Sequence, residues 1–324
     1  MRAYQLDSFG TPATLRDLPL PSPGPGEVRL RIAACGLNFA DLLMQQGKYQ
    51  ERPALPFTLG MELAGTVEAL GPAADAGIGL PAPGTRVAVF AGQGGLATHG
   101  CFPASRCTPL PATMSFEQAA AFQVAYGTSH LALDHRARLQ PGETLLVLGA
   151  AGGVGLTAVE IGKRMGARVI ACARGAEKLA IARAAGADHL IDSETPDLRA
   201  ALKALGGVDV VYDPVGGDAF LSALRATNPE GRLLTIGFAS GTVPQIPANL
   251  LLVKNLTVIG LYWGGYLGFR PEVLTASLST LFSWFAEGSL RPHISHSLPL
   301  ERTAEAMALL RDRKSTGKVV VTMA

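Results

Sequence analysis

The chain has 324 residues, of which 48% are hydrophobic and 17% are charged. At about 150 residues per domain, this length predicts two domains. The apolar content is too high for an intrinsically disordered protein. The net charge is +2, and no basic tract or acidic tail stands out. The charge pattern therefore argues against a dedicated nucleic-acid or membrane-surface binder.

The cysteines and the apolar runs of the sequence indicate the cellular compartment of the protein. The sequence contains four cysteines, Cys35, Cys101, Cys107 and Cys172. No two of them form a Cys-x-x-Cys pair, which favours neither a metal knuckle nor a disulfide framework. Met1–Asp7 lacks the apolar segment of a secretory signal, and the longest uncharged run, Leu233–Val253, contains two prolines. Such a run makes a poor membrane helix. We expect a soluble protein of the reducing cytoplasm.

Residues 1 to about 120 are rich in proline and glycine and contain short β-branched runs. Charged and apolar residues alternate in Glu27–Ile32, with the period of a half-buried strand, and Arg86–Phe90 is a second expected strand. The segment at residues 19–26 (PLPSPGPG) has four prolines and cannot be a helix or a central strand. This part predicts an irregular, largely antiparallel β domain.

After Gln140 the pattern changes to apolar strand, glycine turn and helix, repeated. The expected strands are Thr144–Gly149, Arg168–Cys172, His189–Ile191, Val208–Tyr212, Arg232–Ile236 and Leu256–Gly260, with helices at Gly155–Met165 and Glu177–Ala185. This alternation predicts an α/β fold with a doubly wound parallel sheet. Two more helices, Pro271–Glu287 and Leu300–Arg311, and a last strand, Lys318–Thr322, are expected beyond it.

The most informative motif is the glycine turn Gly149–Gly155 (GAAGGVG), between a buried strand and a helix. A dinucleotide requires a tight turn there, a backbone without side chains near its pyrophosphate, and a helix N-terminus directed at it. Gly152 and Gly155 match the second and third glycines of G-x-G-x-x-G, whereas Ala150 departs from the first. The strand before and the βαβ spacing after favour a dinucleotide site. The alternative is a turn that binds no ligand.

The end of the second strand of this unit indicates which dinucleotide is bound. Sites for NAD usually place an acidic residue about 20 residues downstream of the glycines, to bond the ribose 2′-hydroxyl. Arg174 stands there instead, and Lys178 follows in the first turn of the next helix. Two cations suit a 2′-phosphate, so the sequence predicts NADPH.

Several motifs together resemble the medium-chain dehydrogenase/reductase superfamily, along the whole chain. They are residues 34–41 (ACGLNFAD), 59–65 (LGMELAG), 115–120 (SFEQAA), 150–155 (AAGGVG) and 316–320 (TGKVV). Within it, residues 38–41, 115–120 and 150–155 look like the zinc-free NADPH:quinone oxidoreductase (zeta-crystallin-like) branch. The resemblance implies a GroES-like catalytic domain at 1–122 and 264–324 and a Rossmann domain that binds NADPH at 123–263. It also implies a homodimer joined through the edge strand near Leu256–Leu261, where the apolar run Leu250–Val253 is available for burial.

The superfamily's zinc enzymes hold their metal through a Cys and a Gly-His-Glu motif. Asn38 stands where that Cys would be, and Met61 stands where that His would be. Neither an amide nor a thioether is a good zinc ligand, so no metal is expected. Without a Lewis acid, an acceptor that takes hydride readily, a quinone or an enone, is favoured over an alcohol.

The resemblance also implies three catalytic residues. Asn38 and Asp41 would lie beside the nicotinamide end of the cofactor, although both residue types also suit a helix start. Tyr49 would line the substrate cleft between the domains, where a phenol can stack on a quinone or donate a proton. A surface aromatic is the alternative for Tyr49.

The remaining candidates are cofactor-binding residues. They are Thr128, Ala151, Gly152, Gly153, Val154, Gly155, Arg174, Lys178, Gly237, Phe238, Ala239, Ser240, Trp263 and Lys318. Capping for Thr128 and an exposed strand position for Lys318 are the structural alternatives. None of the six histidines forms a spaced pair with a carboxylate or serine, and all are taken as structural or surface residues.

These features favour a reductase that passes hydride from NADPH to a quinone without metal, by positioning the reactants and stabilising the oxyanion. Two alternatives stay open. One is an enoyl- or acryloyl-type reductase acting on an activated C=C bond. The other is a non-enzymatic NADPH-binding protein with a crystallin- or RNA-binding-like role, against which the lack of a basic stripe argues.

Overall fold

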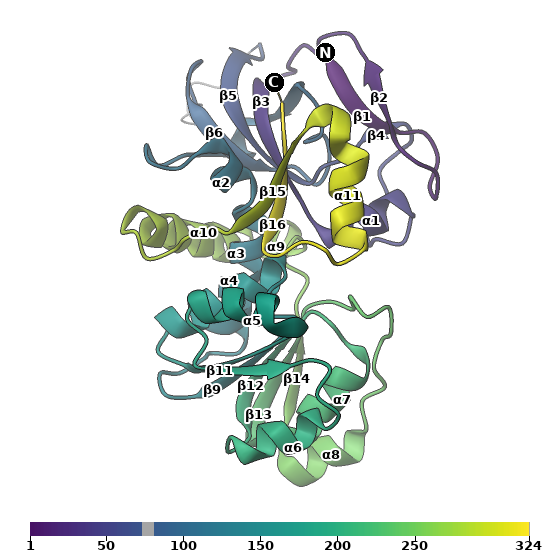
Figure 1. Cartoon of the computed structure of the whole chain (residues 1–324). Helices are drawn as coiled ribbons and strands as arrows, with labels where there is room; N and C mark the ends of the chain where they lie inside the picture. Colours follow the sequence, from purple (N-terminus) through teal and green to yellow (C-terminus); the bar gives the residue numbers. More distant parts are fainter. Residues whose placement is uncertain (73–80, 324) are drawn as a thin grey trace. The chain divides into compact units, whose positions relative to one another are not determined.

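The structure is a computed structural model that describes residues 1–72 and 81–323. It divides into two compact units (Figure 1). The discontinuous unit comprises Met1–Val124 and Pro292–Ala324, and the central unit comprises Ala125–Arg291. Within the described ranges, no helix is both long enough and apolar enough to cross a bilayer.

The discontinuous unit is built on a largely antiparallel sheet with the strand order β15-β16-β3-β5-β6-β8, and β7 also pairs with β3. Its strands are β3 (Glu27–Leu37), β5 (Glu62–Leu70), β6 (Arg86–Phe90), β7 (His99–Pro103), β8 (Cys107–Pro109), β15 (Ile294–Pro299) and β16 (Lys318–Thr322). Val28, Leu30 and Ile32 of β3 are fully buried, as the alternation in the sequence predicts. A smaller sheet contains β1 (Arg2–Leu6), β2 (Thr14–Asp17) and β4 (Phe57–Thr58).

Three α-helices and two short 3₁₀ turns complete the described part of this unit. They are α1 (Phe39–Gln45), α2 (Phe116–Ala120), α11 (Thr303–Arg311), η1 (Ala104–Arg106) and η3 (Leu300–Arg302). The single helix expected over Leu300–Arg311 thus begins as a 3₁₀ turn. The pairing of β16 with β3 places Val319 opposite Leu37, and the pairing of β3 with β5 places Gly36 opposite Glu62. Residues from the two ends of the chain therefore meet in the middle of one sheet.

The central unit contains a parallel sheet with the strand order β11-β10-β9-β12-β13-β14. Its strands are β9 (Thr144–Leu148), β10 (Arg168–Ala173), β11 (His189–Asp192), β12 (Val208–Asp213), β13 (Thr227–Thr235) and β14 (Thr257–Gly260). The helices α4 (Gly153–Arg164) and α5 (Gly175–Ala184) cover one face. The other face carries α6 (Leu198–Ala204), α7 (Gly217–Ala226) and α8 (Ala248–Lys254) (Figure 1). The doubly wound parallel sheet predicted from the sequence is confirmed.

Residues 264–291 belong to the central unit by their contacts, whereas the sequence-based division assigned them to the catalytic domain. They include α9 (Tyr266–Phe269) and α10 (Pro271–Ala286). Ser277 of α10 bonds His130 of α3 (Gln123–His130) at 2.8 Å. Trp284 packs edge-on against the same imidazole and lies under the Arg164 guanidinium of α4. These side-chain contacts, which no local sequence pattern predicts, hold α10 against α3 and α4. The short π-helix η2 (Leu131–Arg136) follows α3.

Candidate active site

Two motif glycines in the turn between β9 and α4, Gly152 and Gly155, have different roles. A Cβ atom on Gly155 would lie 2.1 Å from the carbonyl oxygen of Gly149, which itself has a positive φ of 60°. Gly155 is therefore required for the close approach of the helix to the turn. A Cβ on Gly152 would meet the same oxygen only at 3.3 Å. A methyl group at position 152 would require a shift of a few tenths of an ångström, so packing requires glycine less strictly there than at position 155.

The start of α4 has the features of an anion site. Gly152 is the N-cap residue, and neither a capping side chain nor an acidic first-turn residue is present at this helix start. Gly152 is exposed and Gly153 and Val154 are partly exposed, whereas Ala151 is buried. The first N–H groups of a helix have no partner within it. At α4 they are open to a phosphate, which the helix dipole favours.

Thr128 and Trp263 lie next to each other in the central unit. Thr128 is buried on α3, and a Cβ on its neighbour Gly127 would lie 2.7 Å from Nε1 of Trp263. The indole therefore packs directly on the helix backbone beside Thr128. Their predicted contacts with the cofactor stay predictions.

The predicted loop Gly237–Ser240 bonds to the segment that follows β12. The N–H groups of Ala239 and Ser240 donate to the carbonyl oxygens of Pro214 and Val215, at 3.0 and 2.9 Å. These two N–H groups are therefore used within the protein, and the loop has a fixed conformation. The Phe238 side chain is partly exposed beside them.

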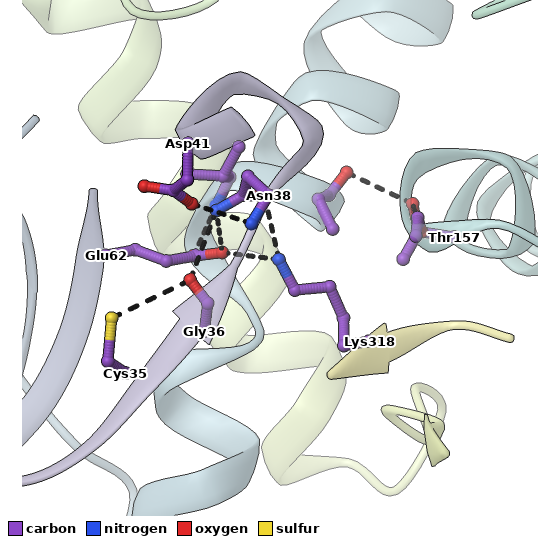
Figure 2. Close-up of polar contacts among 10 residues, drawn as sticks. Cys35, Gly36, Asn38, Asp41, Glu62, Thr157 and Lys318 are labelled. Carbon is purple, nitrogen blue, oxygen red and sulfur yellow. Dashed lines mark hydrogen bonds and ion pairs between the residues drawn. The ribbon is translucent and has the colours of Figure 1, made fainter. Parts of the chain in front are cut away.

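The discontinuous unit contains a buried polar cluster of Asn38, Asp41, Glu62 and Lys318, drawn in Figure 2. The Lys318 ammonium donates to Oδ1 of Asn38 at 2.7 Å and to Oε1 of Glu62 at 2.8 Å. The amide Nδ2 of Asn38 donates to the same Glu62 oxygen at 2.9 Å. Glu62 is 1% and Lys318 5% exposed. The pair is thus compensated in charge and in hydrogen bonds, as a buried ion pair must be.

Asp41 lies in the first turn of α1, where its Oδ2 accepts the N–H of Asn38 at 2.8 Å. Its second oxygen, Oδ1, is buried without a hydrogen-bond partner among the described residues. Burial raises the pKa of this carboxyl to about 7, although the Asn38 N–H and the Lys318 ammonium oppose the shift. Asp41 therefore caps α1 with a buried carboxyl group whose burial favours the protonated form.

Glu62 was missed among the site residues predicted from the sequence. Its Oε1 holds both Asn38 and Lys318, and its Oε2 accepts the N–H of Val124 at 2.9 Å. The sequence contains a signal that points to it, because Glu62 is the single acidic residue within the apolar segment at residues 57–67. A charge inside an apolar strand is seldom buried unless it is paired.

Tyr49 is the third residue predicted to be catalytic. It is partly exposed on the segment between α1 and β4. Its predicted role in the substrate cleft stays a prediction.

Comparisons with known proteins agree with these features. Residues 24–112 match the family "Alcohol dehydrogenase GroES-like domain", and residues 153–283 match "Zinc-binding dehydrogenase". A quinone oxidoreductase-like protein 2 homolog of Nematostella vectensis is 40% identical over 327 residues, which cover 99% of this chain and 88% of the relative. The chain belongs to the quinone oxidoreductase branch of the medium-chain dehydrogenase/reductase superfamily. Its two units have the GroES-like and Rossmann folds of that superfamily.

Other members of this superfamily show its breadth. The synaptic vesicle membrane protein VAT-1 homolog of Homo sapiens is 35% identical, over 93% of this chain and 80% of the relative. A crystal structure of the quinone oxidoreductase of Thermus thermophilus, described together with its NADPH complex, matches with a TM-score of 0.87. That enzyme is 38% identical, over 99% of this chain and 100% of the other.

The residues of this oxidoreductase do not fit the zinc that the second family description implies. Asn38, at the first expected ligand position, has its amide oxygen bonded to the Lys318 ammonium and its nitrogen bonded to Glu62. Met61, at the second, offers a buried thioether. Zinc at Asn38 would have to bind beside a fixed positive charge, without a favourable ligand.

Asp41 is expected to make the stability of the protein depend on pH. A native pKa of about 7, against 3.8 for an ordinary Asp, means that the native state holds a proton that the unfolded state releases. The free energy of unfolding therefore falls between about pH 4 and pH 7 and levels off above. Asp41→Asn keeps an oxygen for the Asn38 N–H and is expected to remove this fall. Urea denaturation across the pH range measures it.

The difference in stability between the wild type and Asp41→Asn excludes the contribution of the other titrating groups. Asp213, whose pKa burial raises to about 6, is present in both proteins and cancels in their difference. Parallel stability curves for the wild type and Asp41→Asn would contradict the assignment.

Proposed function

We propose that this chain is an NADPH-dependent oxidoreductase that reduces quinones by hydride transfer without metal. One observation carries the metal-free part: the Lys318 ammonium binds the residue that stands at a metal-ligand position in the zinc enzymes. Both polar atoms of the Asn38 amide are bonded within the protein, the oxygen to Lys318 and the nitrogen to Glu62. This leaves no favourable metal ligand at the position.

The proposed contacts with the cofactor lie at the starts of two helices of the central unit, α4 and α5. The exposed start of α4, with the N–H groups of Gly153 and Val154, suits the pyrophosphate. Arg174 and Lys178, at the start of α5, suit the 2′-phosphate. NADPH, when bound, supplies the hydride. The NADPH complex of the Thermus thermophilus enzyme supports the choice of cofactor.

In the discontinuous unit, the proposed role of the chain is to hold charge and move a proton. Reduction of a quinone by hydride leaves an oxyanion that must be protonated. Tyr49 is the proposed donor, as the resemblance implies. Asn38 and Asp41 are proposed to orient the reactants.

The test of the proposed function is oxidation of NADPH in the presence of three acceptor classes: quinones, enones and acyl-CoA thioesters. We expect turnover with quinones, unchanged after dialysis against a strong chelator. Activity confined to thioesters or enones would instead favour the enoyl-type reductase. Loss of activity with removal of a stoichiometric metal would overturn the metal-free mechanism. An absence of turnover with all three classes, with NADPH still bound, would favour the non-enzymatic alternative.

The cofactor preference is expected to depend on two cations. Charge-assisted hydrogen bonds contribute roughly 1.5–3 kcal/mol each, and exposure reduces this. About 3 kcal/mol for Arg174 and Lys178 together corresponds to a preference for NADPH on the order of a hundredfold in kcat/KM. Arg174→Ala/Lys178→Ala is expected to lower kcat/KM for NADPH toward that for NADH. A wild type that prefers NADH, or a double variant that keeps the preference for NADPH, would contradict this.

A homodimer through β14 is also proposed. Among the described strands β14 pairs with β13 only, and Leu252 and Val253 of α8 nearby are 78% and 67% exposed. An apolar sheet edge of this kind favours association. We expect sedimentation as a dimer at micromolar concentration and a shift toward monomer in Leu252→Glu/Val253→Glu. A monomeric wild type would refute the proposal.

A further inference from the structure

Two carboxylates converge on the turn that carries Arg174. Asp192 ends β11 and lies opposite Ala173 of β10 in the sheet register. Its Oδ2 accepts the N–H of Gly175, the first residue of α5, at 3.1 Å. Its Oδ1 accepts the N–H of Glu194 at 3.0 Å. Asp192 therefore joins the turn after β10 to the turn after β11.

This arrangement places the Glu194 side chain next to Arg174, the residue predicted to bind the 2′-phosphate. Oε1 of Glu194 lies 3.2 Å from Nε of Arg174, and the two side chains are 68% and 62% exposed. The Arg174 guanidinium thus has a carboxylate partner within the protein. Because both side chains are on the surface, their pairing contributes at most about 1 kcal/mol, and a stronger anion can displace it.

We infer that Glu194 is a specificity-determining residue that weakens the preference for NADPH over NADH. The inference rests on the proposed function. A 2′-phosphate at Arg174 must displace the Glu194 carboxylate or remain close to it, and two anions that share one cation repel each other. A 2′-hydroxyl leaves the Arg174–Glu194 pair intact. Only the phosphorylated cofactor therefore loses affinity through Glu194.

The contribution of Glu194 can be isolated because the other charges at this turn stay constant. Lys178 and Glu177 lie in the first turn of α5, and Asp192 keeps its two backbone bonds. Glu194→Gln removes the negative charge and preserves the backbone N–H that bonds Asp192. A matched control is Glu287→Gln, which neutralises an exposed glutamate paired with Arg164 at 2.9 Å elsewhere in the central unit.

The experiment measures binding of 2′,5′-ADP and of 5′-AMP by calorimetry at fixed ionic strength. Glu194→Gln is expected to tighten 2′,5′-ADP about threefold to fivefold and to leave 5′-AMP unchanged. The kcat/KM for NADPH, but not for NADH, is expected to rise by the same factor. The gain should shrink at high salt, because screening weakens exposed charge pairs. Glu287→Gln should change none of these values.

A second variant shows whether the effect passes through Arg174. In an Arg174→Ala background, Glu194→Gln is expected to lose most of its effect on 2′,5′-ADP. Equal affinities in the wild type and Glu194→Gln would overturn the inference and leave the proposed function standing. So would an equal gain for 5′-AMP, which would show a general field effect. If 2′,5′-ADP and NADPH both fail to bind the wild type, the inference and the proposed cofactor fall together.

Discussion

Lys318→Met is expected to lower the free energy of unfolding by about 3–5 kcal/mol, the usual cost of removing one partner of a buried ion pair. The substitution preserves most of the side-chain volume but leaves the carboxylate of Glu62, which is 1% exposed, without its cation. The amide oxygen of Asn38 also loses its donor. Urea denaturation followed by circular dichroism measures the change.

Two controls separate the charge from the packing. Glu62→Gln/Lys318→Met removes both charges and is expected to recover most of the lost stability. Lys163→Met removes the partner of Asp188 in a largely exposed pair whose atoms are 2.6 Å apart, and is expected to cost less than about 1 kcal/mol. A double variant as unstable as Lys318→Met would show that the charge imbalance is not the cause.

Gly155→Ala is expected to destabilise the central unit by about 3 kcal/mol or more, because its methyl group collides with backbone rather than with a movable side chain. Gly152→Ala is expected to cost less than about 1 kcal/mol in stability, since its contact is 3.3 Å. It should nevertheless weaken NADPH binding about tenfold, because a methyl group then stands where the pyrophosphate approaches the backbone. Thermal denaturation and NADPH titration measure the two effects.

Gly155→Ala is thus expected to lose mainly stability, and Gly152→Ala mainly affinity for NADPH. Equal losses of stability would contradict the assignment of Gly155 to packing. Unchanged NADPH affinity in a folded Gly152→Ala protein would contradict the assignment of Gly152 to the cofactor.

The Rossmann unit was predictable because its signals are local. An apolar strand, a glycine turn and a helix follow one another within Thr144–Arg164, and the structure has β9 and α4 within two residues of the expected bounds. Glu27–Ile32 was recognised from its alternation, although β3 continues to Leu37. Continuation past Ile32 depends on pairing with β5 and β16, which are distant in sequence.

Individual residues of the site could be predicted from the sequence, but the hydrogen bonds and ion pairs among them could not. Asn38 and Lys318 were both named, but their direct bond joins residues 280 positions apart. The carboxylate that holds them, Glu62, has no local feature beyond being an acid in an apolar strand. The Arg174–Glu194 pair likewise depends on the parallel register of β10 and β11. Long-range register, which sequence spacing does not specify, decides which charges meet.

The discontinuous unit has a consequence for the order of folding during synthesis. Its sheet lacks β15 and β16 until the whole central unit has been made, whereas the central unit is continuous and can form first. Until β16 is made, the stretch Ala34–Leu37 of β3 lacks its partner on that side, and Glu62 has no ammonium partner. A nascent chain therefore carries an unfinished sheet through most of translation. A premature stop before Lys318 would remove the cation of the candidate active site together with the strand that closes the sheet.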